Sequence, residues 1–335
     1  MITQAKPTGQ MQLVLDEYLK TGPLPIEELT FEIARLIPLP DRAAVAVYGH
    51  HFAKKALVPF PLPVGDIEHR ILPGADGADI LARVYTPKGD APANGWPILL
   101  YFHGGGFVLA NLDTYDSSCR ALCDGANAVV VSVHYRQAPE YPWPAAPEDA
   151  FAAYQWLLAN AAEIQGDATR IAVGGESAGG NLAAVVAQMA RDKTIAPPLH
   201  QLLVYPVTDM VNGPVSESAL ENADAKPLNR AMLSWFYDYY IPEAGDRTHP
   251  YASPSYAATL IGLPPATVIL SQIDPLRSEG EAYAAQLEAA GVPVTLKIYE
   301  GVTHEFFGLA GLVNEATEAV ALAVKNLRSA FKEGR

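Results

Sequence analysis

The sequence has few cysteines. Only two of its 335 residues are cysteine, Cys119 and Cys123. Their spacing places them on one face of a helix. Two thiols do not make a metal site by themselves, because structural zinc takes four ligands. We therefore expect two buried free thiols and no bound metal.

Basic residues are also in short supply. The chain has 23 Lys and Arg against 37 Asp and Glu, a formal net charge of −14, with no run of five or more like charges. A partner such as nucleic acid or an anionic membrane surface needs a concentrated basic face. The composition therefore argues against both as partners and favours solubility.

Long apolar runs are absent. No uninterrupted apolar stretch reaches about 18 residues, the length that a membrane-spanning helix requires. The start of the chain, residues 1–7, has no apolar core followed by a small-residue cleavage site. We expect no membrane insertion, no signal peptide and a cytoplasmic location.

What the chain does contain is a regular alternation of strand-like and helix-like segments. Half of the residues are apolar, enough to bury a sizeable core. Runs of alternating polarity at 67–72 and 80–85 predict an antiparallel edge pair. Runs suited to burial on both faces follow at 98–102, 129–133, 171–173, 202–205, 267–270 and 294–299, with helical patterns at 150–161, 181–191, 279–290 and at the C-terminal end. This order predicts an α/β fold with a mostly parallel eight-stranded sheet and helices on both faces.

Two segments do not follow the alternation. Residues 1–50 contain amphipathic stretches at 11–19 and 26–37, and residues 207–253 contain an aromatic cluster but no convincing strand. We expect 1–50 to form part of a helical cap and 207–253 to be a helical insertion that completes it. Residues 51–206 and 254–335 then form the main domain, with Pro59, Pro61 and Pro63 as a stiff connector. Core packing is the alternative explanation for the aromatic residues.

A candidate nucleophile lies in the stretch Gly175-Glu176-Ser177-Ala178-Gly179. An apolar run leads into it and an alanine-rich run leads out. A strand that turns at once into a helix at a serine flanked by glycines is typical of a nucleophile elbow. The motif alone is weak, because a phosphate-binding turn or an ordinary tight loop has the same letters. The hypothesis that Ser177 is catalytic therefore depends on finding a base, an acid and an oxyanion site.

Three histidines follow Ser177 and are candidates for the base. In this type of sheet the acid and then the histidine come after later strands. His200 begins a strand and so lies at the wrong edge, and His249 lies in the irregular insertion. His304 follows the last strand in a loop, and we predict that it is the base.

Two aspartates follow strands and are candidates for the acid. Asp274 comes just after the strand at 267–271, and carboxyl ends of strands are where site residues gather in open α/β sheets. Asp209 also follows a strand, but one strand earlier, and a helix-capping or cap-anchoring role explains it without catalysis. We favour Asp274.

The oxyanion site is predicted in His103-Gly104-Gly105-Gly106, directly after the strand at 98–102. A tetrahedral intermediate needs preorganised N–H donors, and consecutive glycines let the backbone approach the reacting carbon. We expect donors at Gly105, Gly106 and Ala178. His103 is expected to shape the loop by hydrogen bonding.

Five motifs together resemble the hormone-sensitive lipase family of α/β-hydrolases, the bacterial family IV esterases. They are His103-Gly104-Gly105-Gly106-Phe107, Tyr135-Arg136-Gln137-Ala138-Pro139-Glu140 with Pro144-Ala145-Ala146, Gly175 to Leu182, Asp274-Pro275-Leu276 and Gly301-Val302-Thr303-His304. The resemblance covers the chain from about residue 65 onward. It implies an α/β-hydrolase fold with a helical cap and a carboxylesterase acting on short- to medium-chain acyl esters. It also implies no cofactor and a catalytic set of Ser177, Asp274 and His304.

The chain departs from the family pattern before the nucleophile. Glu176 stands where the common motif has aspartate, and we expect it to support the elbow rather than to serve as a second acid. Gln137 replaces a usual leucine. Trp235, Phe236, Tyr205 and Leu276 are candidate pocket walls, although ordinary packing explains each of them as well.

Other functions remain open at this point. An amidase or deacetylase would use the same catalytic residues, and a non-catalytic ligand-binding receptor occurs on the same fold. The presence of His304 argues against the receptor. Many relatives pair through the edge of the last strand, here 294–299, so we expect a homodimer formed through this strand. The other expected partner is a small-molecule ester substrate.

Overall fold

Eight strands form one sheet in the computed structural model, which describes residues 5–49 and 61–333. Their order across the sheet is β1-β2-β4-β3-β5-β6-β7-β8. The strands are β1 (Asp66–Pro73), β2 (Asp79–Thr86), β3 (Trp96–Phe102), β4 (Val129–His134), β5 (Gly166–Glu176), β6 (Gln201–Val204), β7 (Ala266–Ile273) and β8 (Val294–Thr303). β2 is antiparallel to both of its neighbours and all other pairs are parallel. The predicted mostly parallel eight-stranded sheet is confirmed.

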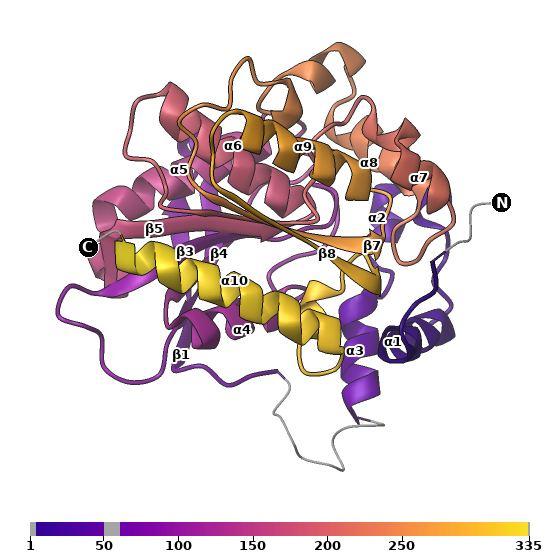
Figure 1. The fold of residues 1–335 in the computed structure, drawn as a ribbon, viewed down its shortest axis with the longest axis horizontal. Coiled ribbons are helices and arrows are strands. Elements are labelled where there is room, and N and C mark those ends of the chain that lie inside the picture. Colours follow the sequence, from indigo (N-terminus) through magenta and orange to yellow (C-terminus); the bar gives the residue numbers. More distant parts are fainter. Residues whose placement is uncertain (1–4, 50–60, 334–335) are drawn as a thin grey trace.

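Helices cover both faces of this sheet (Figure 1). On one face lie α5 (Ala145–Asn160), α6 (Ala178–Asp192) and α9 (Arg277–Ala289), and on the other lie α4 (Asp116–Ala126) and α10 (Asn314–Glu333). Because side chains alternate along a strand, β3 contributes to both cores. Leu100 and Phe102 pack in the core that contains α5, α6 and α9, and Leu99 and Tyr101 pack in the core that contains α4 and α10.

The N-terminal region is helical, but less continuous than its apolar pattern predicted. Helix α1 (Gly9–Lys20) and helix α3 (Pro40–Val47) lie side by side. The stretch 26–37, predicted as one helix, is a 3₁₀ turn η1 (Ile26–Glu28) followed by the single turn α2 (Phe31–Ala34). Leu29 and Thr30 between them are extended, and the carbonyl of Leu29 accepts a hydrogen bond from the Trp235 indole at 3.0 Å. This tertiary contact takes the place of a continued helix.

The insertion at 207–253 contains helices α7 (Glu217–Glu221) and α8 (Arg230–Tyr240), and none of the strands lies there. The aromatic cluster belongs to α8. Asn229, which caps α8, donates a hydrogen bond to Glu27 at 2.7 Å, so the insertion contacts the N-terminal region. The division into cap and main domain stays a prediction. Further 3₁₀ turns are η4 (Ala75–Gly77), η5 (Ala161–Ile164), η6 (Gly213–Val215), η7 (Ala244–Thr248), η8 (Pro254–Tyr256) and η9 (Phe307–Leu309).

The cysteines, the proline connector and the last strand were also predicted from the sequence. Cys119 and Cys123 are buried free thiols on α4, as predicted. Pro59 of the proline connector lies outside the described residues, whereas Pro61 and Pro63 lie in irregular chain before β1. β8 is an edge strand, and pairing of two copies through it stays a prediction.

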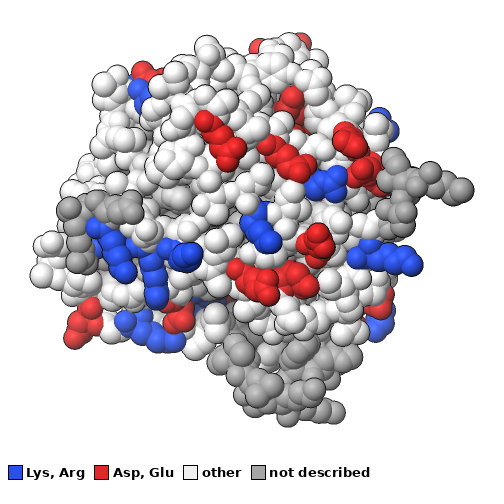
Figure 2. Space-filling view, in the orientation of Figure 1, with Lys and Arg blue, Asp and Glu red and all other residues white. Residues whose placement is uncertain are grey.

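The length of the helices and the charge on the surface are relevant to the partners expected from the sequence. None of the helices within 5–49 and 61–333 is long and apolar enough to cross a membrane. Figure 2 shows one face of the molecule, where both signs of charge occur and uncharged side chains make up most of the surface.

Candidate active site

Ser177 lies at the tight turn between β5 and α6. Its backbone has φ 58° and ψ −118°, a strained combination for a residue with a side chain. The turn also brings Gly179 against β3, where a Cβ would overlap the carbonyl oxygen of Phe102. Glycine is therefore required at 179, and the local motif folds as an elbow that presents the serine hydroxyl.

His304 and Asp274 meet Ser177 from two neighbouring strands. Asp274 follows β7 and His304 follows β8, and the last residues of these strands, Ile273 and Thr303, pair with each other. Nε2 of His304 lies 3.0 Å from Oγ of Ser177, and Nδ1 lies 2.8 Å from Oδ2 of Asp274. The residues predicted as nucleophile, base and acid therefore form one continuous hydrogen-bonded chain.

The carboxylate of Asp274 is held in place by more than the imidazole. The residue is fully buried, and its oxygens accept hydrogen bonds from Oγ of Ser271 at 2.8 Å and from the N–H of Leu276 at 2.9 Å. These bonds leave the carboxylate pointing at Nδ1 of His304. Since a carboxylate only accepts hydrogen bonds, it favours the tautomer of His304 with the proton on Nδ1 and a free lone pair on Nε2.

The pKa of His304 reflects two opposed effects. Burial acts to lower it, because burial disfavours the charged imidazolium. The charge and hydrogen bond of Asp274, followed by the charges of Glu305 and Glu176, outweigh burial and raise the pKa above its ordinary value. The site is thus built to accept a proton on His304.

The other candidates for acid and base lie elsewhere. Asp209 accepts hydrogen bonds from the N–H groups of Val211 and Asn212, at 2.9 and 2.8 Å, and so stabilises a local turn. His200 bonds to Thr267 through Nε2 at 2.8 Å, and Nδ1 of His249 accepts from the N–H of Tyr251 at 3.0 Å. Each has a structural partner away from Ser177.

The loop after β3 presents backbone N–H groups. Gly105 has φ 97°, a left-handed value that favours glycine, and within the described residues the N–H groups of Gly105 and Gly106 donate to no other group. Ala178 is the first residue of α6, where helix geometry leaves its N–H without an intrahelical acceptor.

His103 is buried behind this loop. Its Nδ1 lies 2.8 Å from the carbonyl of Gly104, and its own carbonyl accepts a hydrogen bond from the Tyr135 hydroxyl at 2.8 Å. Burial, followed by the charge of His134, lowers the pKa of His103 to about 3. The residue is therefore neutral near pH 7 and has the loop-shaping contacts expected for it.

Glu176 is packed next to the elbow and borders the cavity over Ser177. It is fully buried and accepts hydrogen bonds from the hydroxyls of Tyr101 and Tyr205. Burial, followed by the charge of Glu305, raises the pKa of Glu176 to about 7. These contacts fit a role in supporting the elbow.

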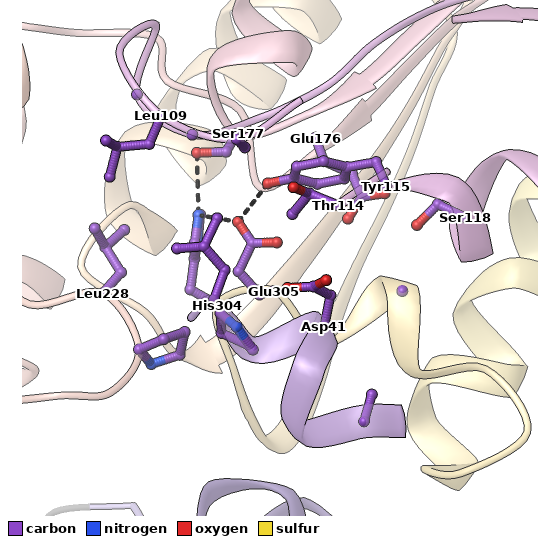
Figure 3. Close-up of a pocket in the computed structure, with 18 of the residues that line it drawn as sticks. Asp41, Leu109, Thr114, Tyr115, Ser118, Glu176, Ser177, Leu228, His304 and Glu305 are labelled. Carbon is purple, nitrogen blue, oxygen red and sulfur yellow. Dashed lines mark hydrogen bonds and ion pairs between the residues drawn. The ribbon is translucent and has the colours of Figure 1, made fainter. Parts of the chain in front are cut away.

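A cavity opens over Ser177 (Figure 3). Phe236 and Leu276 line it, as expected of pocket walls, whereas Trp235 and Tyr205 are not among its lining residues. One part of the lining is apolar and comes mainly from the insertion: Val207, Leu228, Met232, Leu233 and Phe236. In Figure 3 Leu109 and Leu228 lie on one side of His304, and acidic and hydroxyl groups lie on the other.

The acidic side of this cavity was missed at the sequence level. Asp41, Tyr115 and Glu305 line it and come from three distant parts of the chain. In the sequence, only the position of Glu305 directly after His304 indicated that an acidic side chain could lie near the base. Among the residues that the structure describes, no group of three or more His, Cys, Asp or Glu side chains is arranged to hold a metal ion.

The chain is similar in sequence to known hydrolases. Residues 99–308 match the family described as alpha/beta hydrolase fold. Carboxylesterase NlhH of Mycobacterium tuberculosis is 44% identical over 274 residues, covering 81% of this chain and 84% of that protein. Ethyl acetate hydrolase of Pseudomonas putida is 38% identical over 254 residues, covering 76% and 79%.

The solved structures agree with this likeness over nearly the whole chain. A hyperthermophilic esterase from the archaeon Pyrobaculum calidifontis superimposes with a TM-score of 0.85 at 35% identity, covering 97% of this chain and 98% of that one. The thermostable carboxylesterase EstE1, cloned from a metagenomic library, gives a TM-score of 0.82 at 37% identity, covering 92% and 99%.

Proposed function

The chain belongs to the α/β-hydrolase fold family, in its hormone-sensitive lipase branch, and from this premise we propose that it is a serine carboxylesterase. It hydrolyses short- to medium-chain acyl esters through an acyl-enzyme intermediate. The relatives support ester hydrolysis as the reaction class, and the geometry around Ser177 supports the residues that would carry it out.

One observation carries the proposal. Ser177, His304 and Asp274 are joined by hydrogen bonds of 3.0 and 2.8 Å, and the serine hydroxyl faces a cavity. A serine hydroxyl is a poor nucleophile unless a base takes its proton, and the base needs an orienting acid. This arrangement supplies both within hydrogen-bond reach.

In the acylation step, Oγ of Ser177 attacks the ester carbonyl while Nε2 of His304 takes its proton. Asp274 accepts the hydrogen bond from Nδ1 and stabilises the imidazolium that forms. The negative charge on the former carbonyl oxygen is met by the N–H groups of Gly105, Gly106 and Ala178. One such donor typically contributes about 2.7–4 kcal/mol to transition-state stabilisation.

The imidazolium then returns its proton. It protonates the oxygen of the leaving alcohol as the tetrahedral intermediate collapses, which leaves the acyl group on Ser177. A water molecule next gives its proton to His304 and attacks the acyl carbonyl. Collapse of the second intermediate releases the carboxylic acid and restores the serine hydroxyl.

The cavity supports a modest acyl chain. Its volume is about 170 Å³, and a cavity of about 150 Å³ accommodates a ring the size of benzene. The apolar lining from residues 207–236 gives a hydrocarbon chain a favourable environment, at about 0.8 kcal/mol for each buried methylene. A long chain would have to extend out of this space.

The decisive experiment is a chain-length series of 4-nitrophenyl acyl esters, run with the wild-type protein and with Ser177→Ala. We expect wild-type turnover to be greatest for short and medium chains, and the variant to lose several orders of magnitude. Near-normal turnover by Ser177→Ala would contradict the assignment of the nucleophile.

The same assay separates the alternatives. A protein that binds the esters but turns none of them over would be a receptor on this fold. An ester and an amide of one acyl group, compared in kcat/KM, distinguish an esterase from an amidase or deacetylase. We expect the ester to be preferred.

A further inference from the structure

Glu305 directly follows the base, and none of the steps above uses it. Its Oε1 lies 3.7 Å from Nε2 of His304, the nitrogen that faces Ser177 (Figure 3). On the opposite edge of the ring, Asp274 holds Nδ1 at 2.8 Å. The imidazole of His304 therefore lies between two carboxylates, one near each nitrogen.

A hydrogen bond holds the Glu305 carboxylate in this position, and the backbone of Glu305 has an unusual conformation. The hydroxyl of Tyr115 donates a hydrogen bond to Oε1 at 2.6 Å. The backbone of Glu305 has φ 69°, a left-handed value that is uncommon for a residue other than glycine. The side chain is 22% exposed and lines the cavity next to Ser177, so it contacts the space in which the reaction would occur.

We propose that Glu305 is a positioning residue for the catalytic base, a second carboxylate that stabilises the imidazolium of His304 from the Nε2 side. The proposal rests on the function proposed above. At 3.7 Å the contact is too long for a hydrogen bond, so Glu305 acts through its charge. The proton of Ser177 stays on Nε2 until it passes to the leaving alcohol, and Glu305 neither gains nor loses a proton.

The groups that face Glu305 are mostly acidic or neutral. Asp274 follows β7, Glu176 ends β5, Asp41 lies on α3, and the hydroxyls of Tyr115 and Tyr205 come from the segment before α4 and the segment after β6. Arg42 lies 3.8 Å from Asp41 and is 75% exposed. Among the described residues, the imidazolium of His304 is the positive charge that Glu305 contacts directly, at 3.7 Å.

The pKa values of the two groups agree with this arrangement. Burial raises the pKa of Glu305, and the charge of His304 and then the Tyr115 hydrogen bond oppose that effect. In turn the charge of Glu305 contributes to raising the pKa of His304, after the contributions of Asp274. Each charged form thus favours the other, and the two groups titrate as an interacting pair.

This pair predicts a specific pH dependence. Below its pKa the base is already protonated and cannot accept the proton of Ser177, so kcat/KM falls on the acid side. A carboxylate near Nε2 favours the protonated form and moves this acid limb to higher pH. Removing that charge should move the acid limb to lower pH.

The test compares the pH profiles of kcat/KM for wild type, Glu305→Gln and Tyr115→Phe on one 4-nitrophenyl ester. Glutamine keeps the size of the side chain and removes its charge. Phenylalanine at 115 removes the hydroxyl that holds Oε1 without changing residue 305. At the pH where wild type keeps half of its plateau activity, both variants should keep a clearly larger fraction of their own plateau.

The plateau itself should fall by less than about 100-fold in Glu305→Gln, because all of general-base catalysis contributes about 10²–10⁴-fold. Glu305→Asp, which restores a carboxylate, should return the acid limb toward that of wild type. Asp113→Asn is the matched control. It removes a carboxylate from the rim of the same cavity, where Asp113 pairs with Arg83 at 2.6 Å, and should leave the acid limb unchanged.

An acid limb that stays in place in Glu305→Gln and Tyr115→Phe, or that moves to higher pH, overturns the proposal. An acid limb that moves to lower pH by the same amount in Asp113→Asn and in Glu305→Gln also overturns the proposal. The shift would then follow from the loss of any negative charge near the cavity, not from the loss of the carboxylate beside Nε2. These outcomes are distinct from failure of the proposed function, which would appear as absence of ester hydrolysis by the wild-type protein.

Discussion

The ring of Tyr205 packs against the imidazole of His304, with their centroids 4.5 Å apart and their planes tilted by 49°. The hydroxyl of the same tyrosine donates a hydrogen bond to Glu176, which directly precedes Ser177. Tyr205 therefore contacts both the base and the side chain of the residue before the nucleophile. A movement of either element would disturb this contact.

The buried carboxylate of Glu176 predicts a dependence of stability on pH. Its pKa is raised from 4.5 to about 7 in the folded protein, so between these values the native state binds more protons than the unfolded chain. Stability from this group is therefore present below about pH 4.5 and is lost as the pH rises to about 7. The loss is on the order of 3 kcal/mol.

Glu176→Gln tests this dependence, because glutamine cannot ionise. Measured by urea denaturation, the free energy of unfolding of the variant relative to wild type should be more favourable at pH 8 than at pH 5. Glu288→Gln, at an exposed position of α9, serves as the control and should give the same difference at both pH values. A Glu176→Gln difference that is equal at pH 5 and pH 8 would show that Glu176 ionises normally.

The assignment of the acid can be tested against its rival. Asp274→Asn keeps the shape of the side chain but cannot hold His304 in the productive tautomer, and in a serine triad of this type such a change lowers kcat by about 10⁴-fold. Asp209→Asn alters a carboxylate that serves a local turn. We expect its kcat/KM to stay near that of wild type, measured on one ester. Comparable losses in the two variants would remove the basis for choosing Asp274.

An ion pair between a buried carboxylate and a partly exposed arginine predicts an effect on stability. Asp149 is fully buried and accepts three hydrogen bonds from Arg136, at 3.0 Å from the backbone N–H and at 2.8 Å from each of two guanidinium nitrogens. The pair ties α5 to the segment after β4. Asp149→Asn weakens these charge-assisted hydrogen bonds and should cost about 1.5–3 kcal/mol.

Urea denaturation with fluorescence detection measures this cost. The matched control is Asp124→Asn, which breaks the exposed pair with Lys88 at 3.1 Å and should cost less than about 1 kcal/mol. If the two variants have the same free energy of unfolding, the buried pair contributes no more than a surface one.

Much of the fold and the candidate site follows from local patterns. Apolar runs predicted six of the eight strands, because a strand buried on both faces has no polar alternation, and alternating polarity predicted the antiparallel pair β1 and β2. Asp274 and His304 were predicted as the partners of Ser177 from the strands that each residue follows. Parallel neighbouring strands end at one edge of the sheet, so residues at those ends meet there without any further information.

The helix predicted at 26–37 shows where local patterns fail. Its apolar spacing is helical, yet Leu29 and Thr30 are extended and Leu29 bonds to Trp235, 206 residues away. A pattern records which face of a segment is apolar. It does not record a distant donor that competes for a backbone carbonyl.

The sequence by itself determined the sheet, the elbow and the three residues that follow from strand order. Only the tertiary structure decided what surrounds them. Tyr115 and Glu305 are 190 residues apart and meet beside His304 through a hydrogen bond of 2.6 Å. The reason is physical: strand order fixes which chain ends lie together, whereas the charge around a buried imidazole depends on side chains that packing brings in from every layer of the fold.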